Sequence, residues 1–230
     1  MLKTITTCLL VFTSFFLFAQ PDTTADQEEA MAYLIEASRA IDPNRYHDVR
    51  GTPYRYKDFG QIIVYDATLN EYPLERANLN GFTNQVEYYG SDGTIRELSP
   101  QNFLRLEVPQ QDGSKHVYGR GINPKFRDRY AQIIYRGDYI TATMVYDVIN
   151  DEKVVQSVGE TLKLRRFNAK SLHYAMVDGD FMTLKMNAKR LAADLGNKAA
   201  LLKFIKSEQL KVNQDADLVR IYEKADSLFE

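Results

Sequence analysis

The stretch Ile140-Thr-Ala-Thr-Met-Val-Tyr-Asp-Val148 decides the fold class, because apolar and polar residues alternate along it with a period of two. Successive side chains of a β-strand point to opposite faces, so this pattern predicts a strand with one buried face and one wet face. The same alternation recurs at residues 104–108, 162–165 and 182–186. Strands of this kind are typical of antiparallel sheets, and we expect an antiparallel β domain over residues 47–187.

Turn signals separate these strands at short intervals. They are Gly90-Ser91-Asp92-Gly93, Gly137-Asp138, Asn150-Asp151 and Asp178-Gly179. Short connections favour hairpins over βαβ crossovers. Two of the turns also resemble functional motifs, an adhesion tripeptide at 136–138 and a pair of metal-binding carboxylates at 178–180. The strand patterns on both sides favour the hairpin interpretation in each case.

Helical spacing flanks the β region at both ends. Residues 20–46 contain a polar leader and a predicted helix from Asp26 to Ile41, which Asp42-Pro43 should end. Residues 188–230 predict two helices packed on the same domain. The fold class is therefore α+β: an antiparallel β-meander, as a curved sheet or sandwich-like, with one helix before it and two after it.

The first nineteen residues indicate export. Lys3 precedes an apolar run that ends at Ala19, and the chain turns polar at Gln20, which is the pattern of a Sec signal peptide cleaved between these two residues. We therefore expect a periplasmic or envelope-associated protein, or a secreted one. Cys8 is the only cysteine, so the mature chain has no disulfide and no thiolate chemistry.

Composition restricts the possible partners. The formal net charge is -2 at pH 7 and acids and bases are mixed along the chain, so a nucleic-acid partner is not expected, since phosphate binding needs a concentrated basic face. No apolar run in the mature chain is long enough for a transmembrane helix. A protein or an envelope component is the expected partner, and the oligomeric state stays open.

The mature chain lacks the sequence motifs of common catalytic sites, and we expect neither a cofactor nor a metal. It contains no G-x-S-x-G elbow, no H-E-x-x-H and no phosphate-binding glycine loop. The three histidines, His47, His116 and His173, lie far apart in the sequence. His173 is interpreted as a surface or edge residue, because a histidine rarely acts without a positioned partner.

Residues 119–130 form the least regular and most basic stretch. Loops on a rigid sheet often carry binding function, and the cations here could meet a carboxylate, a phosphate or an acidic partner. They are Arg120, Lys125, Arg127 and Arg129. The alternative is a solvated connection in which Asp128 balances part of the charge.

Several motifs together resemble a family of uncharacterised exported β-rich proteins common in Bacteroidota. They are Gly51-Thr52-Pro53-Tyr54, Phe59-Gly60-Gln61-Ile62, Tyr72-Pro73-Leu74-Glu75-Arg76-Ala77-Asn78, Gln85-Val86-Glu87-Tyr88, Leu202-Lys203-Phe204-Ile205-Lys206, Asp217-Leu218-Val219 with Tyr222, and Phe18-Ala19-Gln20. The resemblance implies no activity and no catalytic residue. It favours residence in the envelope, because cargo of that phylum's outer-membrane secretion route usually ends in a small β-sandwich, whereas this chain ends in a helical pattern.

Three functions remain open on the sequence. The first is a non-enzymatic envelope protein that binds a protein partner or envelope component through its sheet face or the 119–130 loop. The second is a carrier or chaperone for an apolar ligand such as a lipid, held near Met144, Met182 and Met186. The third is a secreted hydrolase whose carboxylates converge only in the fold, with Asp147 or Glu87 as candidates.

Overall fold

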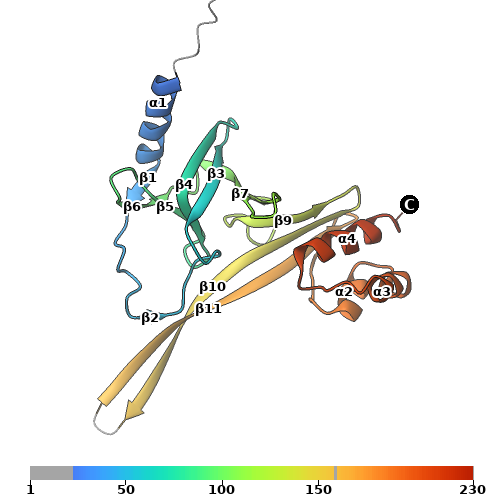
Figure 1. Ribbon diagram of the computed structural model, residues 1–230. Coiled ribbons are helices and arrows are strands. Elements are labelled where there is room, and N and C mark those ends of the chain that lie inside the picture. The colour runs from blue at the N-terminus through green and yellow to red at the C-terminus, as the bar shows by residue number, and fades with distance from the viewer. Residues whose placement is uncertain (1–22, 158–159, 230) are drawn as a thin grey trace, which may run out of the picture.

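The chain folds around one long, open and twisted β-sheet, with a helix near one end and three helices at the other (Figure 1). The computed structural model describes residues 23–157 and 160–229. Over these residues the strands follow the order β1-β6-β5-β4-β3-β7-β8-β9-β10-β11-β12, and β2 pairs with β11. The predicted signal peptide over residues 1–19, with its cleavage point at Ala19 and Gln20, lies outside the described residues.

The strand bounds are as follows. They are β1 Ser38–Ala40, β2 Val49–Arg50, β3 Gly60–Asp66, β4 Glu71–Asn80, β5 Gln85–Tyr89, β6 Ile95–Leu98, β7 Phe103–Pro109, β8 Lys115–Gly119, β9 Ala131–Arg136, β10 Ile140–Ser157, β11 Glu160–Val177 and β12 Asp180–Thr183. The prediction of a β-rich, mainly antiparallel sheet is confirmed. The sheet is nevertheless mixed, because β2 runs parallel to β11.

Three of the four predicted turns connect strands, and the fourth is wrong. Asn150-Asp151 lies inside β10, which pairs with β11 in unbroken register from Ile140 opposite Val177 to Ser157 opposite Glu160. Within the strand, the Asn168 side chain on β11 donates a hydrogen bond to Asp151, whereas the shielded Asn150 Oδ1 has no hydrogen-bond partner among the described residues. A cross-strand partner that is distant in sequence thus overrides a local turn signal.

The N-terminal helix is shorter than predicted. α1 covers Thr23–Glu36 instead of 26–41, and Ser38–Ala40 forms β1, which pairs with β6. Leu34 is buried, whereas Met31 and Ile35 on the expected apolar face are 41% and 48% exposed. The residues that seemed to continue the helix serve the sheet, because pairing with β6 satisfies their backbone groups.

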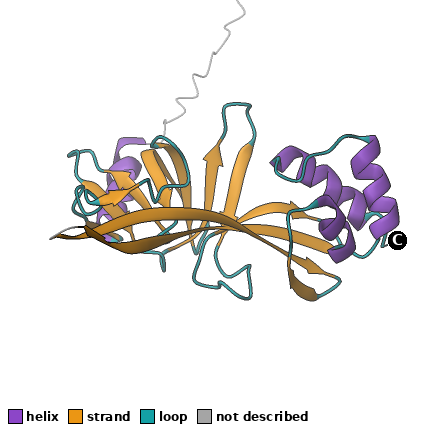
Figure 2. Ribbon diagram, turned by 90° about the horizontal axis from the view of Figure 1, so that it is seen from below, coloured by secondary structure: helices purple, strands orange, loops and turns teal. Residues whose placement is uncertain are grey.

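Three C-terminal helices form where two were predicted. α3 at Lys198–Ser207 and α4 at Asp215–Asp226 match the expected pair, and α2 at Ala188–Asp194 is the additional short helix. α2 begins where the Asn187 side chain accepts a hydrogen bond from the Lys189 amide, as N-cap residues do. The helices gather at one end of the sheet (Figure 2).

Asp226 holds α4 against the β9–β10 turn. Its carboxylate accepts hydrogen bonds from the backbone amides of Asp138, Tyr139 and Ile140 at 3.1, 3.0 and 2.6 Å. A Cβ at Gly137 would collide with this carboxylate. The tripeptide at 136–138 is thus a hairpin turn that docks a helix.

Two large apolar clusters fill the fold. One lies among β3 to β8 and includes Leu34 of α1, and the other lies between β9 to β12 and the C-terminal helices. Met144 is buried in the second cluster, with Met182 and Met186 packed against it. These methionines are core residues of a filled interior. Within the described residues, no helix combines the length and the apolarity that crossing a membrane requires.

Candidate functional site

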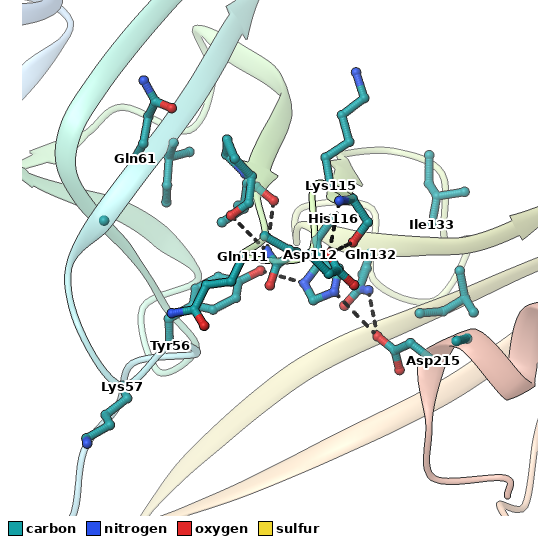
Figure 3. Close-up of a pocket in the computed structure, with 18 of the residues that line it drawn as sticks. Tyr56, Lys57, Gln61, Gln111, Asp112, Lys115, His116, Gln132, Ile133 and Asp215 are labelled. Carbon is teal, nitrogen blue, oxygen red and sulfur yellow. Dashed lines mark hydrogen bonds and ion pairs between the residues drawn. The ribbon is translucent and has the colours of Figure 1, made fainter.

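An open groove of about 750 Å³ lies where the two apolar clusters meet (Figure 3). The 54–59 loop, β3, the β7–β8 hairpin and β9 line it, together with the first turn of α4. Its polar lining residues include Tyr56, Lys57, Asp58, Gln61, Gln110, Gln111, Asp112, Ser114, Lys115, His116, Gln132 and Asp215. Ile62, Val108, Ile134 and Val219 supply apolar surface. This lining is more polar than that of most small-molecule pockets.

Strand register places two groove residues, His116 and Gln132, on one face of the sheet. Tyr118 on β8 stands opposite Gln132 on β9, which stands opposite Met144 on β10, which stands opposite His173 on β11. Residues directly opposite one another point to the same face. His116 precedes Tyr118 by two residues and shares that face. Of these residues, His116 and Gln132 line the groove, whereas Tyr118 and Met144 belong to the two apolar clusters.

Hydrogen bonds connect this row into a network. The Tyr56 hydroxyl lies 3.0 Å from His116 Nδ1 and 2.8 Å from the Tyr118 hydroxyl. Gln132 Nε2 donates to Asp215 Oδ2 at 3.1 Å, so its Oε1 is free to accept from Tyr118 at 3.4 Å. His116 Nε2 is 3.7 Å from Asp215 Oδ2. The network thus joins the sheet to the N-terminus of α4.

Burial shifts the pKa values of several side chains in and beside the network. Desolvation lowers the pKa of His116, although Asp215 opposes this effect. It also lowers the pKa of His173, whose Nδ1 is shielded and has no hydrogen-bond partner among the described residues. Desolvation and Tyr118 raise the pKa of the Tyr56 hydroxyl well above its usual range. His173 is thus partly exposed on β11, which lies between β10 and β12, so it is not an edge residue.

The groove is equipped for hydrogen bonding more than for bond cleavage. A tyrosine nucleophile would need a depressed pKa, and that of Tyr56 moves the other way. Ser114 Oγ donates to Asp112 Oδ1 at 2.6 Å and not to a histidine. Within the described ranges, no three His, Cys, Asp or Glu side chains stand together as metal ligands. The geometry therefore supplies donors and acceptors for a bound molecule.

The basic 119–130 loop does not present its four cations together. Arg129 forms an ion pair with Asp147 and lies 5.5 Å from the centre of the Phe126 ring. Arg120 is partly buried and lies 5.1 Å from the ring centre of Tyr130. Lys125 and Arg127 are the exposed members. Anion or partner binding by this loop stays a prediction, now resting on Lys125 and Arg127.

The predicted charge balance of this loop is also different. Asp147 on β10 is the carboxylate that pairs with Arg129, whereas Asp128 is exposed and its carbonyl accepts a hydrogen bond from Asn84. Asp147, a candidate catalytic carboxylate, is therefore already occupied by a guanidinium.

Glu87, the other candidate carboxylate, lies in a different cluster. It stands opposite Glu97 in the β5–β6 ladder, and both are almost fully buried. Arg45 binds Glu87 and lies 3.9 Å from Glu97, and Arg39 donates to Glu97 at 2.6 Å. The Tyr54 hydroxyl donates to Glu87 at 2.8 Å. Two carboxylates and two guanidiniums balance one another, so this cluster is a structural ion-pair network.

Sequence reasoning missed most of the groove residues. Tyr56, Gln132 and Asp215 come from a loop, a strand and a helix start that are far apart along the chain. His116 has no second histidine close to it in the sequence. The one available signal was Asp215 in the first turn of a predicted helix, where acidic residues are common for electrostatic reasons alone.

A scan against protein-family models, a search of curated proteins and a search of solved structures each find no match to this chain.

Proposed function

We propose that this protein is an exported, non-enzymatic binding protein of the cell envelope, and that its groove holds a neutral, hydroxyl-rich envelope component such as a glycan segment. The observation that carries this proposal is the network of Tyr56, His116, Gln132 and Asp215 on the groove floor. Its groups are held in place before any ligand arrives, which reduces the entropic cost of binding.

The chemistry of the lining favours a neutral polar ligand. Four glutamines border the groove, and a carboxamide both donates and accepts hydrogen bonds, as a sugar hydroxyl does. The charged lining residues are mixed, with Lys57 and Lys115 against Asp58, Asp112 and Asp215. Such a mixture gives no strong preference for an anion or a cation.

Export and envelope residence belong to the same proposal. They rest on the signal pattern that ends at Ala19, and a cell-surface or periplasmic binding protein would meet glycan at its site of action. The other two sequence hypotheses are less well supported. The methionines named for an apolar ligand lie in or against a packed core, and Asp147 and Glu87 are both engaged by arginines.

The test is calorimetric titration of the purified mature chain with soluble fragments of envelope glycan. Gln111 is exposed at the groove, and Gln111→Ala should weaken binding about two- to tenfold, the usual value of one hydrogen bond. Gln101→Ala is the matched control, because Gln101 is an exposed amide outside the groove lining and its removal should leave affinity unchanged.

Two outcomes would contradict the proposal. The first is binding of glycan with equal affinity by both variants and the wild type, which would place the ligand elsewhere. The second is cleavage of the recovered glycan, detected by mass spectrometry, which would make the protein an enzyme. Binding of an extended peptide in place of the glycan would keep the groove as a site but reject the proposed ligand class.

A further inference from the structure

The outer halves of β10 and β11 extend from the body as an arm, seen at the lower left of Figure 1, and β2 pairs with β11 at Arg165 and Arg166 within it. The arm comprises residues 149–156 of β10 and 163–168 of β11. β9 pairs with β10 only over residues 141–145, and the Val148 amide donates to the Gly81 carbonyl at 3.3 Å. Beyond Val148, no described segment pairs with the outer edge of β10, so this edge is open.

The direction of the backbone groups along β10 follows from two hydrogen bonds. The Ile140 carbonyl accepts from the Gly137 amide, and the Val148 amide donates to Gly81, both on the side away from β11. β10 pairs with β11 without a register shift, so alternate residues keep this direction. The backbone groups of residues 150, 152 and 154 therefore face the open edge.

One face of this edge carries two aliphatic and two charged side chains. Ile149 and Val155 are 39% and 43% exposed. Between them, on the same face, lie the acidic Asp151 and the basic Lys153. An aliphatic residue thus stands at each end of an oppositely charged pair.

We propose that a second copy of this chain pairs with this edge, antiparallel and about a two-fold axis at Glu152. In that register Asp151 stands opposite Lys153 of the second copy, and Ile149 stands opposite its Val155. Two-fold symmetry creates each of these pairs twice. Residues 150, 152 and 154 meet the outward-facing residues of the other copy, so every ladder hydrogen bond can form.

Charge selects this register over its neighbours. A shift by one residue would set outward-facing backbone groups against inward-facing ones. A shift of the axis to Asp151 or Lys153 places identical charges opposite each other and loses both ion pairs, and like charges in that position are unfavourable. In the proposed register Glu152 stands opposite Glu152 of the second copy. Lys163 Nζ of the same chain lies 3.5 Å from the Glu152 carboxylate and offsets the repulsion between the two glutamates.

The overall geometry also allows the pairing. Antiparallel arms that overlap over residues 149–155 place the two bodies at opposite ends of a ladder roughly 20–25 Å long. In this register Gln156 of one copy comes opposite Val148 of the other, whose outward amide already donates to the Gly81 carbonyl, so the shared ladder ends at Val155. This inference does not depend on the groove or its ligand.

The test is sedimentation velocity of the mature chain over a range of concentrations, with two charge-reversal variants. Lys153→Glu and Asp151→Lys should each weaken the dimer about tenfold, because attraction becomes repulsion at both symmetric pairs. An equimolar mixture of the two variants should restore association, because each acidic side chain then faces a lysine. Lys189→Glu on α2, an exposed residue with no ion pair among the described residues, is the control and should dimerise as the wild type does.

A monomeric wild type at the highest soluble concentration would overturn the proposal. Dimerisation that neither variant weakens would also overturn it, since the contact would then lie elsewhere. Restoration in the mixture separates loss of pairing from loss of folding, because unfolded variants could not recover the dimer.

Discussion

Two polar clusters within one sheet differ in their exposure to solvent. The two carboxylates of the Glu87–Glu97 cluster are almost fully buried, and each has an arginine partner. The groove network borders a cavity of about 750 Å³, and Asp215 retains 43% of its side-chain exposure. Buried charge that is fully paired supports a structure, whereas polar groups that are fixed but reachable can serve a ligand. Under the proposed function, the first cluster contributes stability and the second contributes binding.

The largest expected effect comes from removing Arg45. Arg45→Ala leaves Glu87 buried without its main counter-ion, and the loss of one partner of a buried ion pair typically costs about 3–5 kcal/mol of unfolding free energy. Urea denaturation followed by circular dichroism measures it. A loss below about 1 kcal/mol would show that solvent reaches this cluster and would remove the contrast with the groove.

A matched pair of tyrosines in one loop sharpens the comparison. Tyr54 donates to the carboxylate of Glu87, and Tyr56 joins the groove network. Tyr54→Phe should cost about 1.5–3 kcal/mol of stability, the usual range for a hydrogen bond to a charged group. Tyr56→Phe should cost about 0.5–1.5 kcal/mol and weaken glycan binding, whereas Tyr54→Phe should leave binding unchanged. The reverse order in the same denaturation and titration experiments would exchange the roles of the two clusters.

Lowering the pH should change the contributions of the two clusters to the free energy of unfolding in opposite directions. Burial lowers the pKa of His116 below its ordinary 6.5, so the unfolded chain takes up a proton first and His116 contributes a loss of stability as pH falls through that value. Burial raises the pKa of Glu87 above its ordinary 4.5, so the folded state takes up the proton first. Its contribution increases as pH falls and is complete below 4.5.

Denaturation at a series of pH values isolates these contributions. His116→Gln should reduce the decline in stability near pH 6.5, and Glu87→Gln should remove the gain that acid provides between neutral pH and 4.5. An unchanged pH profile in either variant would mean that the residue does not have the burial on which this expectation rests.

The smallest expected effect concerns Arg39. It binds Glu97 but is 75% exposed, and exposed ion pairs contribute about 0–1 kcal/mol. Arg39→Ala should therefore change stability by no more than that in urea denaturation. A loss as large as that of Arg45→Ala would show that both arginines are required to neutralise the carboxylates.

Local patterns predicted the sheet better than its boundaries. The period-two alternation of residues 140–148 identifies the strand, but its second face is not wet, because Thr143 and Val145 are buried as well. The end of α1 and the continuation of β10 through Asn150-Asp151 depend on β6 and on Asn168. Such partners are distant in sequence, so a window of neighbouring residues contains no sign of them.

The groove could not be predicted for the same reason. Tyr56, His116, Gln132 and Asp215 occupy four separate elements, and only the register of β8 to β10 and the docking of α4 bring them together. Each residue alone has an ordinary interpretation, as a sheet tyrosine, a surface histidine or a helix-start acid. The basic loop shows the opposite error, because its cations cluster in sequence but Arg129 turns inward to Asp147.

The most direct test of the central claim is a two-dimensional NMR titration of the isotope-labelled mature chain with soluble envelope glycan fragments. The account predicts shifts concentrated at Tyr56, Gln111, His116 and Asp215, little change at Glu87, and recovery of intact glycan. Shifts confined to other surfaces, no shifts at saturating glycan, or recovery of cleaved glycan would contradict it.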